Sequence, residues 1–156
     1  MAGVESRVME RWNRARGSRF GRWIFSRAVG RFAPYTGTIG ARVEELEPGR
    51  SVVTMRDRKA VRNHLRSVHA VALTNLIELS GSFAIIASMH ADTRMIPVRL
   101  ESEFLRKARG TVTAEGSCEQ FEPGYEGEVQ ATVVVRDPDG EEVTRGRVTV
   151  VIGRAS

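Results

Sequence analysis

The sequence predicts an α+β fold in which an antiparallel β-sheet wraps around one long helix. Residues 70–89 are apolar around nearly the full circumference of a helix and carry a single charge, Glu78, which indicates a helix buried on most sides. The segments on either side, residues 38–55 and 96–152, instead alternate apolar and polar side chains with the period of half-buried strands. One apolar helix among antiparallel strands covers a face of a sheet, and 156 residues suffice for one such domain.

By charge, the chain divides into a basic N-terminal helical arm, residues 1–34, and a nearly neutral main domain, residues 35–156. The arm carries eight arginines against two glutamates, whereas the rest of the chain carries 16 basic and 17 acidic side chains. A dedicated DNA-binding domain is basic in its main body, and a single-strand binder also has aromatic residues among the basic ones. Neither pattern is present, so we expect no nucleic-acid partner.

The arm is predicted to be an interrupted helix over residues 4–32. We expect breaks at Gly17, Gly21 and Gly30, and an end before Pro34, because the residue that precedes a proline avoids the helical region. The apolar stripe within the last ten of these residues is expected to pack on the sheet or on a dimer interface. Contact with a membrane surface is the less favoured alternative, because the glycines weaken an amphipathic helix. In that alternative, Trp12, Trp23 and Phe25 form the side of the helix that contacts the membrane.

Six strands are predicted from alternating side chains and turn signals. The first two are joined by Glu47-Pro48-Gly49-Arg50, which has proline and glycine at the positions that a type II turn requires. The predicted strands cover residues 38–46, 51–55, 96–104, 110–119, 128–136 and 142–152, and residues 56–66 form a polar, basic loop. In the first strand after the helix, one face is charged and the other carries Ile96, Val98, Leu100, Ser102 and Phe104.

Cysteine and histidine usage argues against disulfides and metal sites. Cys118 is the only cysteine, so the chain forms no internal disulfide and no cysteine-based metal cluster, which fits a reducing compartment. His64, His69 and His90 include no pair at helical i, i+4 spacing, so we expect no bound metal. The first ten residues lack the long apolar run of a secretory signal, and we therefore expect a cytoplasmic protein.

The loop before the long helix carries a motif that resembles a known enzyme family. It reads Asn63-x-x-Arg66-x-x-His69-Ala70-Val71, and Glu78 follows nine residues after the histidine. This pattern is similar to Asn-x-x-Gly-x-x-His-Gly-Gly, with an acidic residue nine places after the histidine, in the PaaI-like group of hotdog-fold thioesterases. The motif departs from the group where Arg66, Ala70 and Val71 replace glycines, and we expect the larger residues either to narrow the substrate pocket or to move the thioester.

Two further segments are similar to the same superfamily, so that the resemblance covers most of residues 20–152. The run Phe104–Gly110 is similar to the Tyr-Leu-x-Pro-Ala-Arg-x-Gly strand end of that group. The segment from Pro34 to Gly37, with the hairpin at Pro48 and Gly49, looks like the branch usually labelled a domain of unknown function. The resemblance implies a hotdog fold, an antiparallel sheet wrapped around a central helix.

The function implied by the resemblance is hydrolysis of an acyl-coenzyme A thioester, with coenzyme A as part of the substrate and no other cofactor. It also implies a homo-oligomer, a dimer or a dimer of dimers, in which Glu78 acts on a carbonyl held by the helix start of a partner chain. The alternative is a non-catalytic protein that binds acyl-coenzyme A or fatty acids, which is consistent with the replaced glycines.

The start of the long helix offers hydrogen-bond donors to a substrate. The N–H groups of Ala70 and Val71 lack partners within the helix and lie at its positive end. Donors of this kind stabilise the negative charge that develops on a thioester carbonyl oxygen. The candidate catalytic residues are Glu78, Asn63 and His69; we expect a positioning role for His69, and Asn63 is chosen on its spacing to that histidine.

Glu78 is the candidate base because it stands in an apolar helix. Burial disfavours the charged carboxylate and raises its pKa toward neutrality, where it can take a proton from water or attack as a nucleophile. The alternative is a structural role, in which Glu78 completes a buried hydrogen-bond network with Asn63 or His69 of a partner chain.

Two basic clusters are expected beside this site. The first contains Arg56, Arg58, Lys59, Arg62 and Arg66, and the second contains Arg106, Lys107 and Arg109. Guanidinium and ammonium groups suit the phosphates of coenzyme A. We therefore predict that Arg66, Arg106, Lys107 and Arg109, with the amides of Ala70 and Val71, bind substrate. The alternative is a solvated surface whose charges are offset by Glu101 and Glu103.

Overall fold

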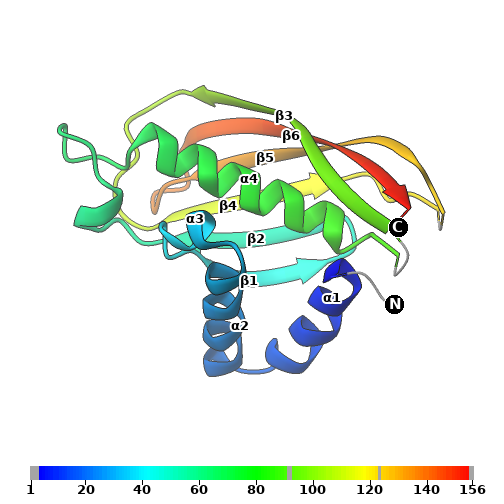
Figure 1. Cartoon of the computed structure of the whole chain (residues 1–156). Coiled ribbons are helices and arrows are strands. Elements are labelled where there is room, and N and C mark those ends of the chain that lie inside the picture. Colours follow the sequence, from blue (N-terminus) through cyan, green and yellow to red (C-terminus); the bar gives the residue numbers. More distant parts are fainter. Residues whose placement is uncertain (1–3, 91–92, 123, 155–156) are drawn as a thin grey trace.

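The long apolar segment forms a helix and the alternating segments form six strands, as the sequence predicts (Figure 1). The computed structural model describes residues 4–90, 93–122 and 124–154, so the ends of the predicted arm and main domain lie outside the described residues. The helices are α1 (Val4–Ala15), α2 (Arg19–Phe32), α3 (Pro34–Gly37) and α4 (Ala70–Ile86), with a short 3-10 turn, η1 (Lys59–Val61). The strands are β1 (Arg42–Glu47), β2 (Arg50–Met55), β3 (Thr93–Phe104), β4 (Val112–Cys118), β5 (Gly127–Arg136) and β6 (Glu142–Arg154).

The six strands form one antiparallel sheet in the order β1-β2-β4-β5-β6-β3. Helix α4 lies across one face of this sheet and packs mainly on the four central strands (Figure 1). The type II turn is confirmed, because Gly49 has a φ of 77° and Glu47 pairs with Arg50 across it. Strand β1 begins at Arg42, four residues later than predicted, because turn hydrogen bonds between Tyr35 and Gly40 occupy the preceding backbone. The predicted α+β architecture is thus confirmed.

Glycines allow α4 to lie close to the sheet. A Cβ atom at Gly81 would lie 2.6 Å from a methyl carbon of Val148, and one at Gly116 of β4 would lie 2.6 Å from the carbonyl oxygen of Ser80. The hydroxyl of Ser51 in β2 donates a hydrogen bond to that same buried carbonyl at 2.7 Å. This contact ties α4 to the sheet at a fixed rotation, which leaves its outer side for the functional residues described below.

The arm folds into two helices that turn back on one another. Gly17 lies in the break between α1 and α2, as predicted, whereas Gly21 and Gly30 lie inside α2, so the predicted breaks there are wrong. A side chain at Gly21 would collide with the backbone of Ala15, and one at Gly30 would collide with Gly37. These two glycines therefore permit close packing of neighbouring helices rather than ending a helix.

Aromatic side chains join the arm to the core of the main domain. Trp12 of α1 and Phe25 of α2 are 2% and 6% exposed, and their rings meet edge to face with centroids 5.2 Å apart. Phe25 also lies 6.2 Å from the ring of Phe83 in α4. The predicted packing of the apolar stripe is therefore confirmed for Phe25, whereas Trp23 and Phe32 remain exposed.

The burial of Trp12 and Phe25 removes two of the three aromatic side chains on which the membrane alternative depends. Among the described residues, no helix is both long enough and apolar enough to cross a membrane.

Strand β3 lies at an edge of the sheet and exposes several apolar side chains. Among the described residues it pairs with β6 alone; it begins three residues before the predicted start, and it has an irregularity between Pro97 and Arg99 that interrupts strict alternation. The exposed apolar side chains of this strand are Ile96, Val98, Leu100 and Phe104. Ile96 pairs with Val151 and Leu100 pairs with Val148, which point to opposite faces of the sheet, so the predicted single apolar face of this strand is wrong. An edge strand presents unpaired backbone donors and acceptors, so this edge is suited to pairing with another strand.

Candidate active site

The start of α4 is capped by the histidine that precedes it. The N–H of Val71 donates a hydrogen bond to His69 Nδ1 at 3.0 Å, which requires that this nitrogen be unprotonated. The expectation that Val71 offers a free N–H is therefore wrong, because the histidine side chain takes that donor. The N–H of Ala70 makes no hydrogen bond within the part of the chain that the structure describes, so of the two predicted amides it is the one left for a ligand.

Asn63 shapes the loop that leads into α4. Its side-chain oxygen accepts hydrogen bonds from the N–H of Leu65 at 2.9 Å, and from both the N–H and the hydroxyl of Ser67 at 3.2 Å. Arg66, inside this turn, has a φ of 57°, the left-handed region that glycine adopts most easily. The related motif has glycine at this position. The left-handed backbone conformation here, rather than the width of a pocket, is what favours glycine at position 66.

The structure brings the two predicted basic clusters together at the start of α4. The N–H of Val68 donates to the carbonyl of Ala108 at 2.9 Å, which joins the two loops. Arg106 is held by Glu141 at 2.7 Å. The remaining predicted cations Arg66, Lys107 and Arg109 are exposed and form no ion pair with a described residue. These three exposed cations lie on the two loops joined beside the start of α4, and Arg109 also acts on the Asp57 carboxylate.

Asp57 anchors the first of these loops. It pairs with Arg62 at 2.6 Å and accepts a hydrogen bond from the N–H of Gly110 at 3.0 Å. The hydrogen bond from Arg62, together with that from Gly110, lowers the pKa of the Asp57 carboxyl below its ordinary value. Arg62 is thereby engaged in holding the two loops and is not free for a ligand.

Glu78 is half-buried on the outer side of α4, two turns from the helix start. Ser82, one turn further on, donates a hydrogen bond from its hydroxyl to Glu78 Oε1 at 3.0 Å. Burial raises the pKa of Glu78 above its ordinary value of 4.5, as the sequence predicts, and the hydrogen bond from Ser82 opposes this rise. The second carboxylate oxygen accepts no hydrogen bond from the described residues.

A cavity of about 440 Å³ adjoins Glu78 and Ser82, with walls that come mainly from the arm and α4. Its apolar lining includes Val8, Phe25, Val29, Phe32, Ile86 and Met95. Arg7 and Arg11 of α1 also line it. A cavity of this size, apolar except for a few polar groups, is typical of a small-molecule site. The arm therefore builds part of the candidate site.

A single chain does not bring all of the predicted residues together. Ala70 and Glu78 are eight residues apart on α4, which is about 12 Å at 1.5 Å per residue. A carbonyl oxygen bound at Ala70 is therefore out of reach of Glu78 in the same chain. Asn63 and His69 also lie at the helix start and form no hydrogen bond with Glu78 of the same chain. The alternative network with these residues of a partner chain stays a prediction.

The family of the chain follows from its sequence. The profile of the family described as a domain of unknown function, DUF4442, matches residues 21–152. The chain belongs to the DUF4442 family. No curated protein matches it in sequence.

Solved structures share the architecture of this DUF4442 protein. It is similar to the structural-genomics protein APC5556, with 31% identity and a TM-score of 0.81 over 98% of this chain and 100% of the other. It is similar to PA5026 of Pseudomonas aeruginosa, described as a probable thioesterase, with 22% identity and a TM-score of 0.72 over 83% and 93%. A thioesterase family protein from Silicibacter pomeroyi gives 22% identity and a TM-score of 0.71 over 83% and 96%. The hotdog fold is thereby confirmed.

Ser82 and the arm-derived walls are the parts of this DUF4442 site that sequence reasoning missed. Ser82 stands four residues after Glu78, a spacing that places both on one side of a helix, so this signal was present in the sequence. The contribution of Arg7 and Phe32 depends on how α1 and α2 turn back at Gly17. The break at Gly17 was predicted, but no local pattern shows the direction in which α2 leaves it.

Proposed function

We propose that this DUF4442 protein hydrolyses the thioester of an acyl-coenzyme A, with Glu78 as the general base. The observation that carries the proposal is the setting of Glu78, a half-buried carboxylate at the wall of an apolar cavity with one oxygen held by Ser82. A carboxylate whose pKa is raised toward the working pH is a better proton acceptor than an exposed one. The thioesterase names of two proteins with the same fold support this reaction class.

The reaction requires a base and a donor for the oxyanion. Glu78 takes a proton from water, and the oxygen of that water forms a bond to the thioester carbonyl carbon. The carbonyl oxygen becomes negative and is stabilised by backbone N–H donors such as that of Ala70. The carbon–sulfur bond then breaks, and the thiolate of coenzyme A takes the proton from Glu78. The products are a carboxylic acid and free coenzyme A.

A second copy of the chain supplies the other half of the site in this proposal. The roughly 12 Å between Ala70 and Glu78 is too long for one carbonyl group to contact both in the same chain. A two-fold dimer can place the helix start of one chain beside Glu78 of the other. The exposed apolar side chains and unpaired edge of β3 supply the surface for this association.

The two ends of the substrate match two surfaces of the molecule. The acyl group fits the apolar cavity beside Glu78, whose walls come from the arm and α4. The exposed cations Arg66, Lys107 and Arg109 at the start of α4 suit phosphate groups of coenzyme A. Arg106 contributes less to this binding than the sequence suggests, because Glu141 already neutralises it.

A non-catalytic protein that binds acyl-coenzyme A or fatty acids is the second candidate function. The hydrogen bond from the Val71 N–H to His69 favours it, because this contact removes one of the two expected oxyanion donors.

Thiol release from a panel of acyl-coenzyme A thioesters tests the proposal. The parent protein is expected to release thiol from at least one of them, and Glu78→Gln is expected to lower kcat by about 10²–10⁴-fold with little change in KM. Glu119→Gln is the matched control, because this exposed carboxylate does not line the cavity, and it should keep the parental rate. Equal rates for the parent and Glu78→Gln contradict the role of base. Saturable binding without thiol release supports the second candidate.

A further inference from the structure

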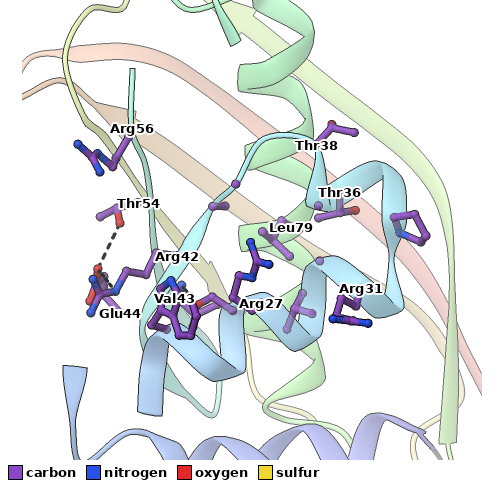
Figure 2. Close-up of a pocket in the computed structure, with 18 of the residues that line it drawn as sticks. Arg27, Arg31, Thr36, Thr38, Arg42, Val43, Glu44, Thr54, Arg56 and Leu79 are labelled. Carbon is purple, nitrogen blue, oxygen red and sulfur yellow. Dashed lines mark hydrogen bonds and ion pairs between the residues drawn. The ribbon is translucent and has the colours of Figure 1, made fainter. Parts of the chain in front are cut away.

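A second, larger hollow adjoins the cavity beside Glu78. It is a groove of about 1050 Å³ between α2, the turn of α3 and strand β1 (Figure 2). Val29, Thr36 and Leu79 line both hollows, so the groove and the cavity meet along these three residues. We call it the arginine groove after the basic residues that line it, Arg27, Arg31, Arg42 and Arg56.

The arginine groove has one carboxylate, Glu44 of β1, and other groups already occupy both of its oxygens. Oε1 lies 3.2 Å from Arg42 Nε and accepts a hydrogen bond from the Thr54 hydroxyl at 3.3 Å. Oε2 lies 3.4 Å from Nε of Arg22 on α2. Figure 2 shows Glu44 beside Arg42 at one side of the groove. Two guanidinium groups thus share one carboxylate at the wall, a net positive group, and no other carboxylate lines the groove among the described residues.

The other three arginines have no partner of opposite charge. Arg27, Arg31 and Arg56 form no ion pair or side-chain hydrogen bond with the residues that the structure describes. The Arg27 guanidinium lies over the ring of Trp23, 5.7 Å from its centroid, a cation–π contact that positions the charge without neutralising it. Arg27 and Arg31 are one turn apart on α2, and like charges at this spacing destabilise a helix. An anion in the groove relieves that repulsion.

We propose that the arginine groove binds the phosphate groups of a small phosphorylated molecule. Guanidinium groups bind phosphate oxygens through paired N–H donors, and Arg27, Arg31 and Arg56 approach the groove from two different elements, α2 and the end of β2. The hydroxyl of Thr36, where the groove meets the cavity, is a further donor. The phosphates are either those of coenzyme A or those of a free phosphorylated metabolite. The first source depends on the proposed function, because the acyl end would then lie in the adjoining cavity; the second does not.

Calorimetric binding of adenosine 3′,5′-bisphosphate and of inorganic pyrophosphate, at low ionic strength, tests the proposal without any turnover. The parent is expected to bind at least one of these probes, and Arg27→Gln/Arg31→Gln to weaken that binding at least about ten-fold. Arg14→Gln/Arg16→Gln removes two charges from the same arm outside the groove and should bind as the parent does. Circular dichroism establishes that each variant is folded.

Three results would overturn the proposal: no binding of either probe to the folded parent, equal weakening by the two double variants, or binding to anionic phospholipid vesicles alone. Coenzyme A and pantetheine, which lacks the nucleotide, distinguish the sources. Weaker binding of coenzyme A to Arg27→Gln/Arg31→Gln than to Arg66→Gln/Lys107→Gln places the coenzyme phosphates in the groove. Unchanged binding of coenzyme A to the groove variant, with the probes weakened, identifies a free phosphorylated ligand. Thiol release by the parent is measured separately, so failure of the groove and failure of the thioesterase proposal are distinct results.

Discussion

Ser82 donates a hydrogen bond to Glu78 across one turn of α4, at 3.0 Å, and so fixes one of the two carboxylate oxygens. Two effects act on the pKa of Glu78 in opposite directions: burial raises it, and the Ser82 hydroxyl lowers it by stabilising the charged form. Burial is the larger effect. The pair therefore gives a carboxylate that is oriented toward the cavity and is still basic enough to accept a proton.

The pH dependence of thiol release is the first prediction. If Glu78 must be ionised to act, kcat/KM rises with pH through the pKa of Glu78, and the midpoint of this acid limb lies above 4.5, the ordinary value. Ser82→Ala removes the hydrogen bond that lowers this pKa, so the midpoint should move to higher pH. Ser82→Thr keeps a hydroxyl and should restore the parental midpoint. An unchanged acid limb in Ser82→Ala contradicts a positioning role for Ser82.

A second prediction concerns stability rather than rate. Because folding raises the pKa of Glu78, the protonated carboxyl favours the folded state at acidic pH, and this contribution is lost as pH rises through the folded pKa. Glu78→Gln stays neutral at every pH and should therefore be more stable than the parent at neutral pH, by roughly 1 kcal/mol or about 2–4 °C in Tm. The gain should vanish at a pH below 4.5. A lower Tm for Glu78→Gln at neutral pH would favour a structural network over a catalytic base.

The third prediction tests the edge of the sheet. Val98→Glu places a charge on the exposed edge strand β3 and should convert a dimer or tetramer into a monomer, with loss of thiol release. Tyr35→Glu on α3 is the matched control, because Tyr35 is an exposed aromatic side chain that lies outside the apolar stripe of the arm and outside that strand. Light scattering at micromolar protein measures both. A parent that is monomeric and fully active refutes assembly across β3.

The fold was predictable because its signals are local. Glu78 as the lone charge of a long apolar run identifies the helix that the sheet surrounds, and the Pro48-Gly49 pair fixes the hairpin between β1 and β2. The candidate site was only partly predictable. The raised pKa of Glu78 follows from its apolar neighbours, whereas the capture of the Val71 N–H by His69 depends on a side-chain rotamer that no spacing specifies. The role of Gly21 was not predictable for a similar reason, because glycine occurs both where a helix ends and where two helices pack closely, and the sequence does not distinguish the two cases.

The loop before α4 provides the last prediction, because Arg66 combines a charge suited to phosphate with a backbone conformation suited to glycine. A residue with a Cβ atom is strained at a φ of 57°, and this strain lowers the stability of the folded state by about 1–2 kcal/mol. Glycine avoids the strain, but it also makes the unfolded chain more flexible, which offsets part of the gain in stability. Arg66→Gly should therefore raise the free energy of unfolding by about 0.5–1 kcal/mol, measured by urea denaturation.

Arg66→Ala is the control that separates the two properties, since alanine removes the charge but keeps the Cβ atom. Both variants should raise the KM for acyl-coenzyme A if the Arg66 guanidinium contacts a phosphate, whereas the gain in stability should be confined to Arg66→Gly. An equal gain with alanine would mean that charge repulsion among the basic residues at the α4 start, rather than backbone strain, limits the stability of this loop. A KM unchanged in both variants would remove Arg66 from the substrate site and leave Lys107 and Arg109 as the cations beside Ala70.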